Sequence, residues 1–326
     1  MKLNKLSISR FFNKHMLEVI LILLIAFMSF TSDAFLNVGN ILNILRNVSM
    51  TGIIAFGMTF VIIAGEIDLS VGSTVGLSGV ITAITAGALA NTGMSLGVSV
   101  IFGIILSFVV TLIVGLFNGL LLTKFKMPSF IITLGMLNLL YGVGAVISKG
   151  FPVTTLPEWF SWLGAGMVFG IIPVPAIFML VVFIISFVVM KYTKFGRSVY
   201  ATGGNPESAR LSGINTKFIK IAVLVIVQLC SALSGILLSS QVMSGSFSFG
   251  RGWEMTAISA VIIGGASLSG GKGNIKGTFL GLLFLGVIQN AMTINGVDDY
   301  VQYIVQGALI LGAVLINTIQ SKRKLS

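Results

Sequence analysis

The sequence predicts an all-α integral membrane protein with about ten transmembrane helices, and its composition leads to that fold class. Of the 326 residues, 56% are hydrophobic and only 9% are charged, whereas a soluble domain carries roughly 25% charged residues. The surplus apolar surface must therefore face lipid. The 39 glycines lie within apolar runs, as expected where membrane helices approach one another closely. Residues 1–326 are predicted to form one polytopic domain.

Apolar runs and the polar breaks between them predict the spans in order. Lys2, Lys5, Arg10 and Lys14 precede the first run, but no Ala-x-Ala pattern follows it, so we expect an uncleaved first span and not a signal peptide. Segment 148–162, with two prolines and two tryptophans, is expected along an outer surface, because tryptophan prefers the headgroup level. The predicted spans are 16–30, 47–64, 69–90, 95–122, 129–147, 171–190, 218–242, 256–268, 278–293 and 301–319.

The basic residues predict the orientation of these spans. If the N-terminus is inside and the spans alternate, only Arg46, Lys149 and Arg251 of the 20 Lys and Arg residues fall outside. The other seventeen fall on the inner side, as the positive-inside rule requires. Both termini are therefore predicted to be cytoplasmic.

Several function classes are disfavoured by residue usage. The basic residues are scattered between apolar runs and form no single face, so the net charge of +11 does not indicate nucleic-acid binding. Cys230 is the only cysteine and His15 the only histidine. We therefore do not expect a metal site, a catalytic triad or an internal disulfide. We predict no catalytic residue, no metal and no cofactor in this chain, and a membrane enzyme is disfavoured.

The longest polar inner loop, 191–215, is predicted to hold a short cytoplasmic helix over residues 206–212. Asn205 suits the N-cap, Pro206 the first helical position and Glu207 the positive end of the helix dipole. Gly213 suits the position after the helix where φ becomes positive. An ordinary capped loop is the plain alternative, but a short helix on a membrane face is also what a cytoplasmic partner could grip.

Glu66, Asp68 and Ser70 are candidates for the translocation pathway, because ionisable groups near an apolar boundary are costly and often functional. Carboxylates also accept hydrogen bonds from sugar hydroxyls. The alternative for Asp68 is structural, since it stands where it could cap the span that begins near residue 69.

Two further stretches are informative. Residues 269–274, SGGKGN, lack the first glycine and the final hydroxyl residue of a nucleotide-binding P-loop, so they predict a tight inner turn and no ATP site. Residues 61–65, VIIAG, are similar to residues 261–265, VIIGG, and each is followed by Leu-Ser. Duplicated halves are common in transporters, although chance similarity between apolar strings would look the same.

Three motifs together resemble bacterial sugar permeases of the ribose type, within the superfamily that also includes branched-chain amino acid permeases. They are residues 196–214, GRSVYATGGNPESARLSGI, residues 67–72, IDLSVG, and residues 261–273, VIIGGASLSGGKG. The resemblance covers nearly the whole chain. Glu66 departs from it, because ribose permeases usually have glycine there. The stretch Gly-Gly-Asn-Pro-Glu is more similar to the sugar branch than to the amino-acid branch.

The resemblance implies the permease subunit of an ATP-binding-cassette importer of a monosaccharide in a bacterial cell membrane. It implies three partners: a cytoplasmic ATP-binding subunit, an extracytoplasmic sugar-binding protein, and a second permease copy or a paralogue. The residues expected to couple to the ATPase are Gly203, Gly204, Asn205, Pro206, Glu207, Ala209, Arg210 and Gly213.

The resemblance leaves the transported substrate open. Ribose, rhamnose, xylose, galactose and autoinducer-2 all fit it. The rival of a different class is an ion-coupled secondary transporter, which the near absence of charged residues within the spans disfavours.

Overall fold

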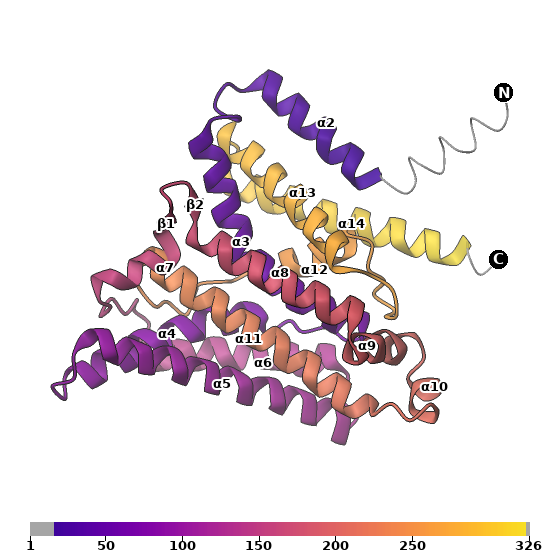
Figure 1. Cartoon of the computed structure of the whole chain (residues 1–326), viewed down its shortest axis with the longest axis horizontal. Coiled ribbons are helices and arrows are strands. Elements are labelled where there is room, and N and C mark those ends of the chain that lie inside the picture. Colours follow the sequence, from indigo (N-terminus) through magenta and orange to yellow (C-terminus); the bar gives the residue numbers. More distant parts are fainter. Residues whose placement is uncertain (1–15, 324–326) are drawn as a thin grey trace.

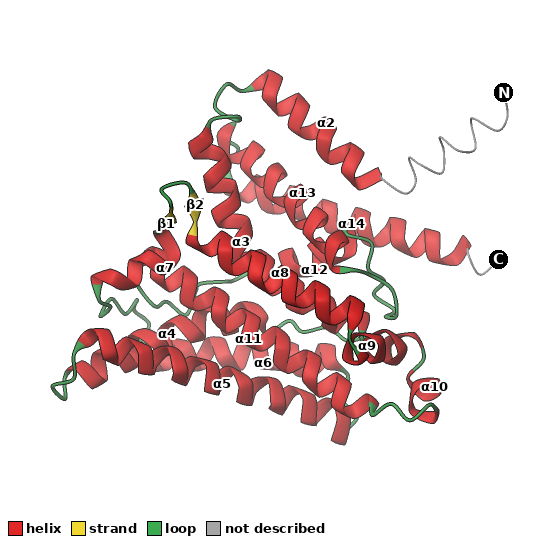
Figure 2. Ribbon diagram, in the orientation of Figure 1, coloured by secondary structure: helices red, strands yellow, loops and turns green. Residues whose placement is uncertain are grey.

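The computed structural model describes residues 16–323, and these form helices joined by short loops with one two-stranded hairpin (Figures 1 and 2). The basic residues from Lys2 to Lys14, His15 and Lys324 lie outside the described range. The elements are α2 (Met16–Thr31), α3 (Val38–Ile63), α4 (Val71–Ala90), α5 (Leu96–Lys124), α6 (Ser129–Ile147), η1 (Glu158–Phe160), α7 (Ser161–Ala165), β1 (Met167–Val168), β2 (Ile172–Pro173), α8 (Val174–Tyr192), α9 (Lys194–Gly204), α10 (Pro206–Leu211), α11 (Thr216–Val242), α12 (Trp253–Ile263), α13 (Ile275–Ile294) and α14 (Asp299–Arg323).

The prediction of an integral membrane protein is confirmed. Within residues 16–323, seven helices are long and apolar enough to cross a membrane, namely α3, α4, α5, α6, α8, α11 and α13. Shorter apolar helices span Leu17–Thr31, Trp253–Ile263 and Tyr300–Gly312.

Burial separates the central helices from the peripheral ones. In the most apolar stretch of α3, 83% of the residues are buried. In the corresponding stretches of α5, α6 and α8, 33%, 28% and 33% of the residues are buried. The exposed face of α5 carries large apolar side chains such as Ile101, Phe102 and Ile105, as a lipid-facing surface requires. Helix α11 packs on α3, α4, α5 and α7, and α3, α4 and α11 are the most buried of the long helices, so these three form the centre of the structure.

Helix α3 begins at Val38, nine residues before the predicted start of that span at residue 47. Asn40, Asn43 and Asn47 interrupt the apolar pattern, although Asn37 caps the helix by accepting from the Gly39 N–H at 2.9 Å. Segment 148–162 does not lie wholly on a surface. Trp159 and Trp162 are exposed, but Phe160 is fully buried, and the hydroxyl of Ser240 in α11 donates to its carbonyl.

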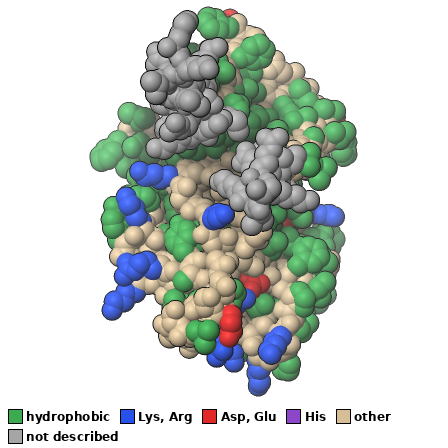
Figure 3. Space-filling view, turned by 90° about the vertical axis from the view of Figure 1, so that its right-hand side faces the viewer, with side chains coloured by type: hydrophobic (Ala, Val, Ile, Leu, Met, Phe, Trp, Pro, Cys, Tyr) green, Lys and Arg blue, Asp and Glu red, His purple; other side chains and the backbone are tan. Residues whose placement is uncertain are grey.

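Helices α9 and α10 lie together at one end of the molecule, at the right of Figure 1. Figure 3 views this end and shows several separate Lys and Arg side chains among hydrophobic and uncharged surface. Exposed basic residues of the adjoining elements include Lys191, Lys194, Arg197, Arg210, Lys217, Lys272 and Lys276.

Candidate functional site

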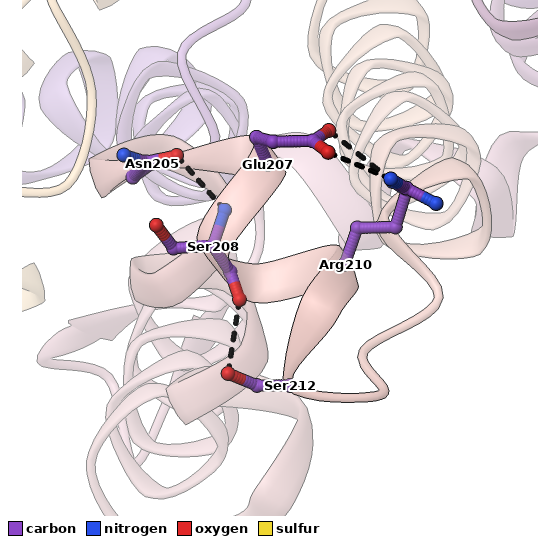
Figure 4. Close-up of polar contacts among 5 residues, drawn as sticks. All are labelled: Asn205, Glu207, Ser208, Arg210 and Ser212. Atoms are coloured by element: carbon purple, nitrogen blue, oxygen red, sulfur yellow. Dashed lines mark hydrogen bonds and ion pairs between the residues drawn. The ribbon is translucent and has the colours of Figure 1, made fainter.

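The short helix predicted after Asn205 is present, and its caps are those expected. The Asn205 side chain accepts from the Ser208 N–H at 2.9 Å, and Pro206 occupies the first helical position (Figure 4). At the other end Gly213 has φ +84°, and the Ile214 N–H donates to the Ala209 carbonyl at 3.0 Å. This hydrogen bond closes a Schellman motif, which ends the helix after two turns.

The tip of α10 is held by its own side chains. Arg210 donates two hydrogen bonds to the Glu207 carboxylate, at 2.6 and 3.2 Å (Figure 4). These bonds and the charge of Arg210 lower the pKa of Glu207, so the pair stays ionised at neutral pH and weakens only in acid. Leu211 beside it is 75% exposed. Helix α10 therefore exposes the Glu207–Arg210 ion pair and the apolar side chain of Leu211, and no other described residue covers them.

Helix α9 packs closely on the rest of the protein at Gly203, where only a glycine fits. A Cβ added to Gly203 would lie 1.8 Å from the carbonyl oxygen of Ile63 and 2.8 Å from the Gly271 nitrogen. The Gly271 N–H donates to that same Ile63 carbonyl at 2.9 Å. The Tyr200 hydroxyl donates to the Gly273 carbonyl at 2.9 Å. Helix α9 thus contacts the end of α3 and the loop after α12 at one point.

The ends of α3 and α12 have the same geometry, which accords with the internal repeat proposed from the sequence. The Glu66 N–H donates to the Val61 carbonyl at 3.0 Å, and the Ala266 N–H donates to the Val261 carbonyl at 3.1 Å. Gly65 and Gly265 have φ of +83° and +90°. Both helices therefore end in a Schellman motif at equivalent positions of the two sequence stretches.

Asp68 and Ser70 are fully buried at the start of α4. One Asp68 oxygen accepts from the Ser70 N–H at 2.8 Å and the Ser70 hydroxyl at 2.6 Å. The other accepts from Gln228 Nε2 at 2.8 Å, and Gln228 Oε1 accepts from the Thr74 hydroxyl at 2.6 Å. These bonds fix Asp68 beside the start of α4, but the N-cap residue is Ser70 and no side chain caps the helix. A capping role and a pathway role for Asp68 both stay predictions.

Glu66 is 8% exposed and forms an ion pair with Lys220 of α11, with 2.5 Å between Oε1 and Nζ. Lys220 and Gln228 were not singled out by sequence reasoning. Gln228 could have been, because an amide in the middle of an apolar span needs a hydrogen-bonding partner.

The glycine-rich turn 269–274 connects α12 to α13 as predicted. Gly270 and Gly271 have φ of +79° and +70°, and Asn274 caps α13 by accepting from the Gly277 N–H at 2.7 Å. Among the described residues, no group of three or more His, Cys, Asp or Glu could hold a metal ion.

The apolar helical bundle defines an integral membrane protein, and comparison with known proteins identifies its family. The profile of the family described as "Branched-chain amino acid transport system / permease component" matches residues 40–314. The chain belongs to this family.

The chain is similar to curated ribose permeases along most of its length. It is 43% identical to the ribose import permease protein RbsC of Bacillus subtilis, over 91% of this chain and 90% of the relative. It is 38% identical to RbsC of Haemophilus influenzae, over 98% and 97%. The L-arabinose transport system permease protein AraH of Escherichia coli is 37% identical, over 85% and 82%. No solved structure matches. The predicted resemblance to ribose-type permeases is thereby confirmed.

Proposed function

We propose that this chain is the membrane-spanning subunit of an ATP-driven importer of ribose in a bacterial cell membrane. The observation that carries the proposal is the similarity over nearly the full length to ribose import permeases, together with the outward-facing helix α10. The proposed topology has ten crossings with both termini inside. In support, the described residues contain seven long and three shorter apolar helices, and basic residues gather at the α9–α10 end.

The proposed assembly contains a cytoplasmic ATP-binding subunit, an extracytoplasmic sugar-binding protein and a second permease copy or paralogue. In this assembly the ATP-binding subunit docks on residues 203–213. ATP binding moves α10 and α9 together, and α9 transmits that movement to the ends of α3 and α12. The chain itself supplies a route for sugar and no catalytic residue.

Co-purification with the ATP-binding subunit tests the docking surface. Glu207→Arg places two cations side by side at the tip of α10, and Gly213→Val forces a β-branched residue into positive φ, which costs about 1–2 kcal/mol. We expect the detergent-solubilised wild type to retain the ATPase and both variants to release it.

Glu158→Arg is the matched control, because it reverses an exposed charge in η1, on the connection between α6 and α8 and away from α10. It should bind like the wild type. If no ATPase binds the wild type, or if the α10 variants bind as well as the control, an ion-driven carrier becomes the better explanation.

A further inference from the structure

A cavity of about 300 Å³, lined by both polar and apolar side chains, lies between α3, α11, α12 and α13. Its lining comes from the first half of α3, the last turns of α11, the first turn of α12 and the second half of α13. Gln289 lies 14 residues beyond the start of α13, which is roughly 20 Å along the helix axis. The cavity is therefore in the half of the bundle far from α9 and α10, which is the outer half in the proposed topology.

The cavity lining carries exposed polar side chains, which are unusual on a surface that faces lipid. Asn43 and Asn47 lie four residues apart on one face of α3, and Gln289 and Thr293 do the same on α13. All four are exposed in the isolated chain. Polar side chains at such positions are costly against lipid and face an aqueous space instead. Helix α5 shows the contrast, since its exposed positions such as Ile105 are apolar.

Most of the lining amides do not join one helix to another. Of the lining amides, Asn290 is the one that joins α13 to α3, through two hydrogen bonds of 3.0 and 2.7 Å with Asn40. By contrast, the side chains of Asn43, Asn47 and Gln289 have no hydrogen-bond partner among the described residues. These three exposed amides beside one cavity are therefore available to donate and accept hydrogen bonds with a ligand that enters it.

The chemistry of the lining selects a small neutral polyhydroxylated ligand. Asn and Gln side chains both donate and accept hydrogen bonds, as sugar hydroxyls do, and the lining contains no charged side chain. Trp253 adds an aromatic surface for the apolar face of a sugar ring. A volume near 300 Å³ is at the lower end of small-molecule pockets, which suits one monosaccharide.

The cavity is closed toward the α9–α10 end. Met50, Leu282 and Leu285 line it, and the fully buried Ile53 and Phe56 follow on α3. A second cavity of about 260 Å³ shares Thr256, Leu285 and Gln289 with it. The far half of the bundle thus contains a cavity with several amide side chains, and a packed apolar core separates it from the α9–α10 end.

We propose that this cavity is a transient binding site for the sugar on its route through the membrane, in which Asn47 and Gln289 hydrogen-bond to sugar hydroxyls. The inference rests on the proposed function as a monosaccharide importer. It places the first polar contacts in the outer half of the bundle, away from Glu66, Asp68 and Ser70.

Proteoliposomes containing the permease, its ATPase and ribose-loaded binding protein provide the first test. Asn47→Leu and Gln289→Leu replace the amide with an apolar group and so remove the donors and acceptors proposed to bind sugar. Each should reduce uptake of radiolabelled ribose roughly tenfold, while hydrolysis of ATP stimulated by the binding protein stays within about twofold of wild type. Asn138→Leu, the same change on α6, is the control and should leave uptake unchanged.

The outcomes separate the two proposals. Wild-type uptake with both cavity variants equal to the Asn138→Leu control overturns the cavity assignment alone. Absence of ribose uptake by the wild type overturns the importer function, and the cavity assignment with it.

Thiol labelling provides a test that does not depend on transport. Cys230 is the only cysteine of the chain, so Cys230→Ala gives a cysteine-free background. Asn47→Cys in that background should react with a water-soluble methanethiosulfonate reagent, and ribose with its binding protein should slow the reaction several-fold. Ile105→Cys, on the lipid-facing side, should not react. Labelling of Asn47→Cys that is absent, or that sugar leaves unchanged, overturns the proposal.

Discussion

The Gly271 N–H donates to the Ile63 carbonyl at 2.9 Å, which joins the end of α3 to the loop after α12 although the two residues are far apart in sequence. Gly203 of α9 lies against the same carbonyl. A movement of α9 would therefore displace the end of α3 and the loop that follows α12 together. In the proposed importer this contact carries the force of ATP binding from α10 to the two halves of the bundle.

Gly203→Ala should uncouple ATP hydrolysis from transport. The added methyl group would lie 1.8 Å from the Ile63 oxygen, so α9 must move away from the junction. We expect sugar uptake to fall at least tenfold in reconstituted complexes, with a lowered thermal unfolding temperature. Gly135→Ala in α6 is the matched control, because a Cβ there meets nothing within 4 Å and the residue lies outside the docking segment 203–213. Equal behaviour of the two variants would contradict the transmission role of Gly203.

Tyr200→Phe should weaken the same junction more gently. It removes the hydrogen bond of 2.9 Å to the Gly273 carbonyl, which is worth about 1 kcal/mol. Burial raises the pKa of the Tyr200 phenol, so the folded protein holds the proton more tightly than the unfolded chain. The stability contributed by this residue is thus complete below pH 10 and is lost as the pH rises through the folded pKa.

The measurement is thermal unfolding of the wild type and Tyr200→Phe at several pH values. The difference between the two should be constant between pH 6 and 9 and should shrink at higher pH. A difference that shrinks already between pH 6 and 9 would show that another group controls the junction.

The buried network at the start of α4 should be essential for stability. Asp68→Leu leaves the Ser70 N–H and the Ser70 hydroxyl without their acceptor at positions closed to water. Gln228 Nε2 loses one of its two acceptors and keeps the other, Ser70 Oγ. Each unsatisfied donor costs about 1–3 kcal/mol, so the variant should be strongly destabilised. Ser107→Ala is the control, because the buried Ser107 hydroxyl has no hydrogen-bond partner. Thermal unfolding in detergent compares them, and a small shift for Asp68→Leu would favour the pathway role instead.

The sequence predicted those parts of the site that depend on interactions between residues close together in the chain. The caps of α10 at Asn205 and Gly213 were predictable because an N-cap side chain and a positive φ each act within a few residues. The membrane class followed from composition. The start of α3 was predicted too late, since Asn40, Asn43 and Asn47 look like a loop when their partners and the cavity are unknown.

The pairings of the site could not be predicted, because they depend on packing between distant helices. Nothing near Asp68 in sequence indicates that Gln228 donates to it, and nothing near Glu66 indicates Lys220. The close packing of Gly203 against the Ile63 carbonyl likewise depends on the contact between α9 and α3, which the sequence does not indicate.

The Glu66–Lys220 ion pair should be detectable as a coupling energy. Glu66→Lys and Lys220→Glu each place two like charges together where Glu66 is only 8% exposed and the Lys220 side chain 24% exposed. The double exchange restores opposite charges. Because the pair lies between the exposed and buried limits, we expect a coupling of roughly 1–2 kcal/mol in a double-mutant cycle of thermal unfolding.

The same cycle at Glu207 and Arg210 is the control for charge reversal, since that pair is exposed and water screens its charges. It should give a smaller coupling that salt removes, whereas the coupling of Glu66 and Lys220 should largely persist in salt. If both couplings vanish in salt, water reaches Glu66 in the assembled protein. That result would remove the structural explanation for a glutamate at this position and return Glu66 to the candidates for the pathway.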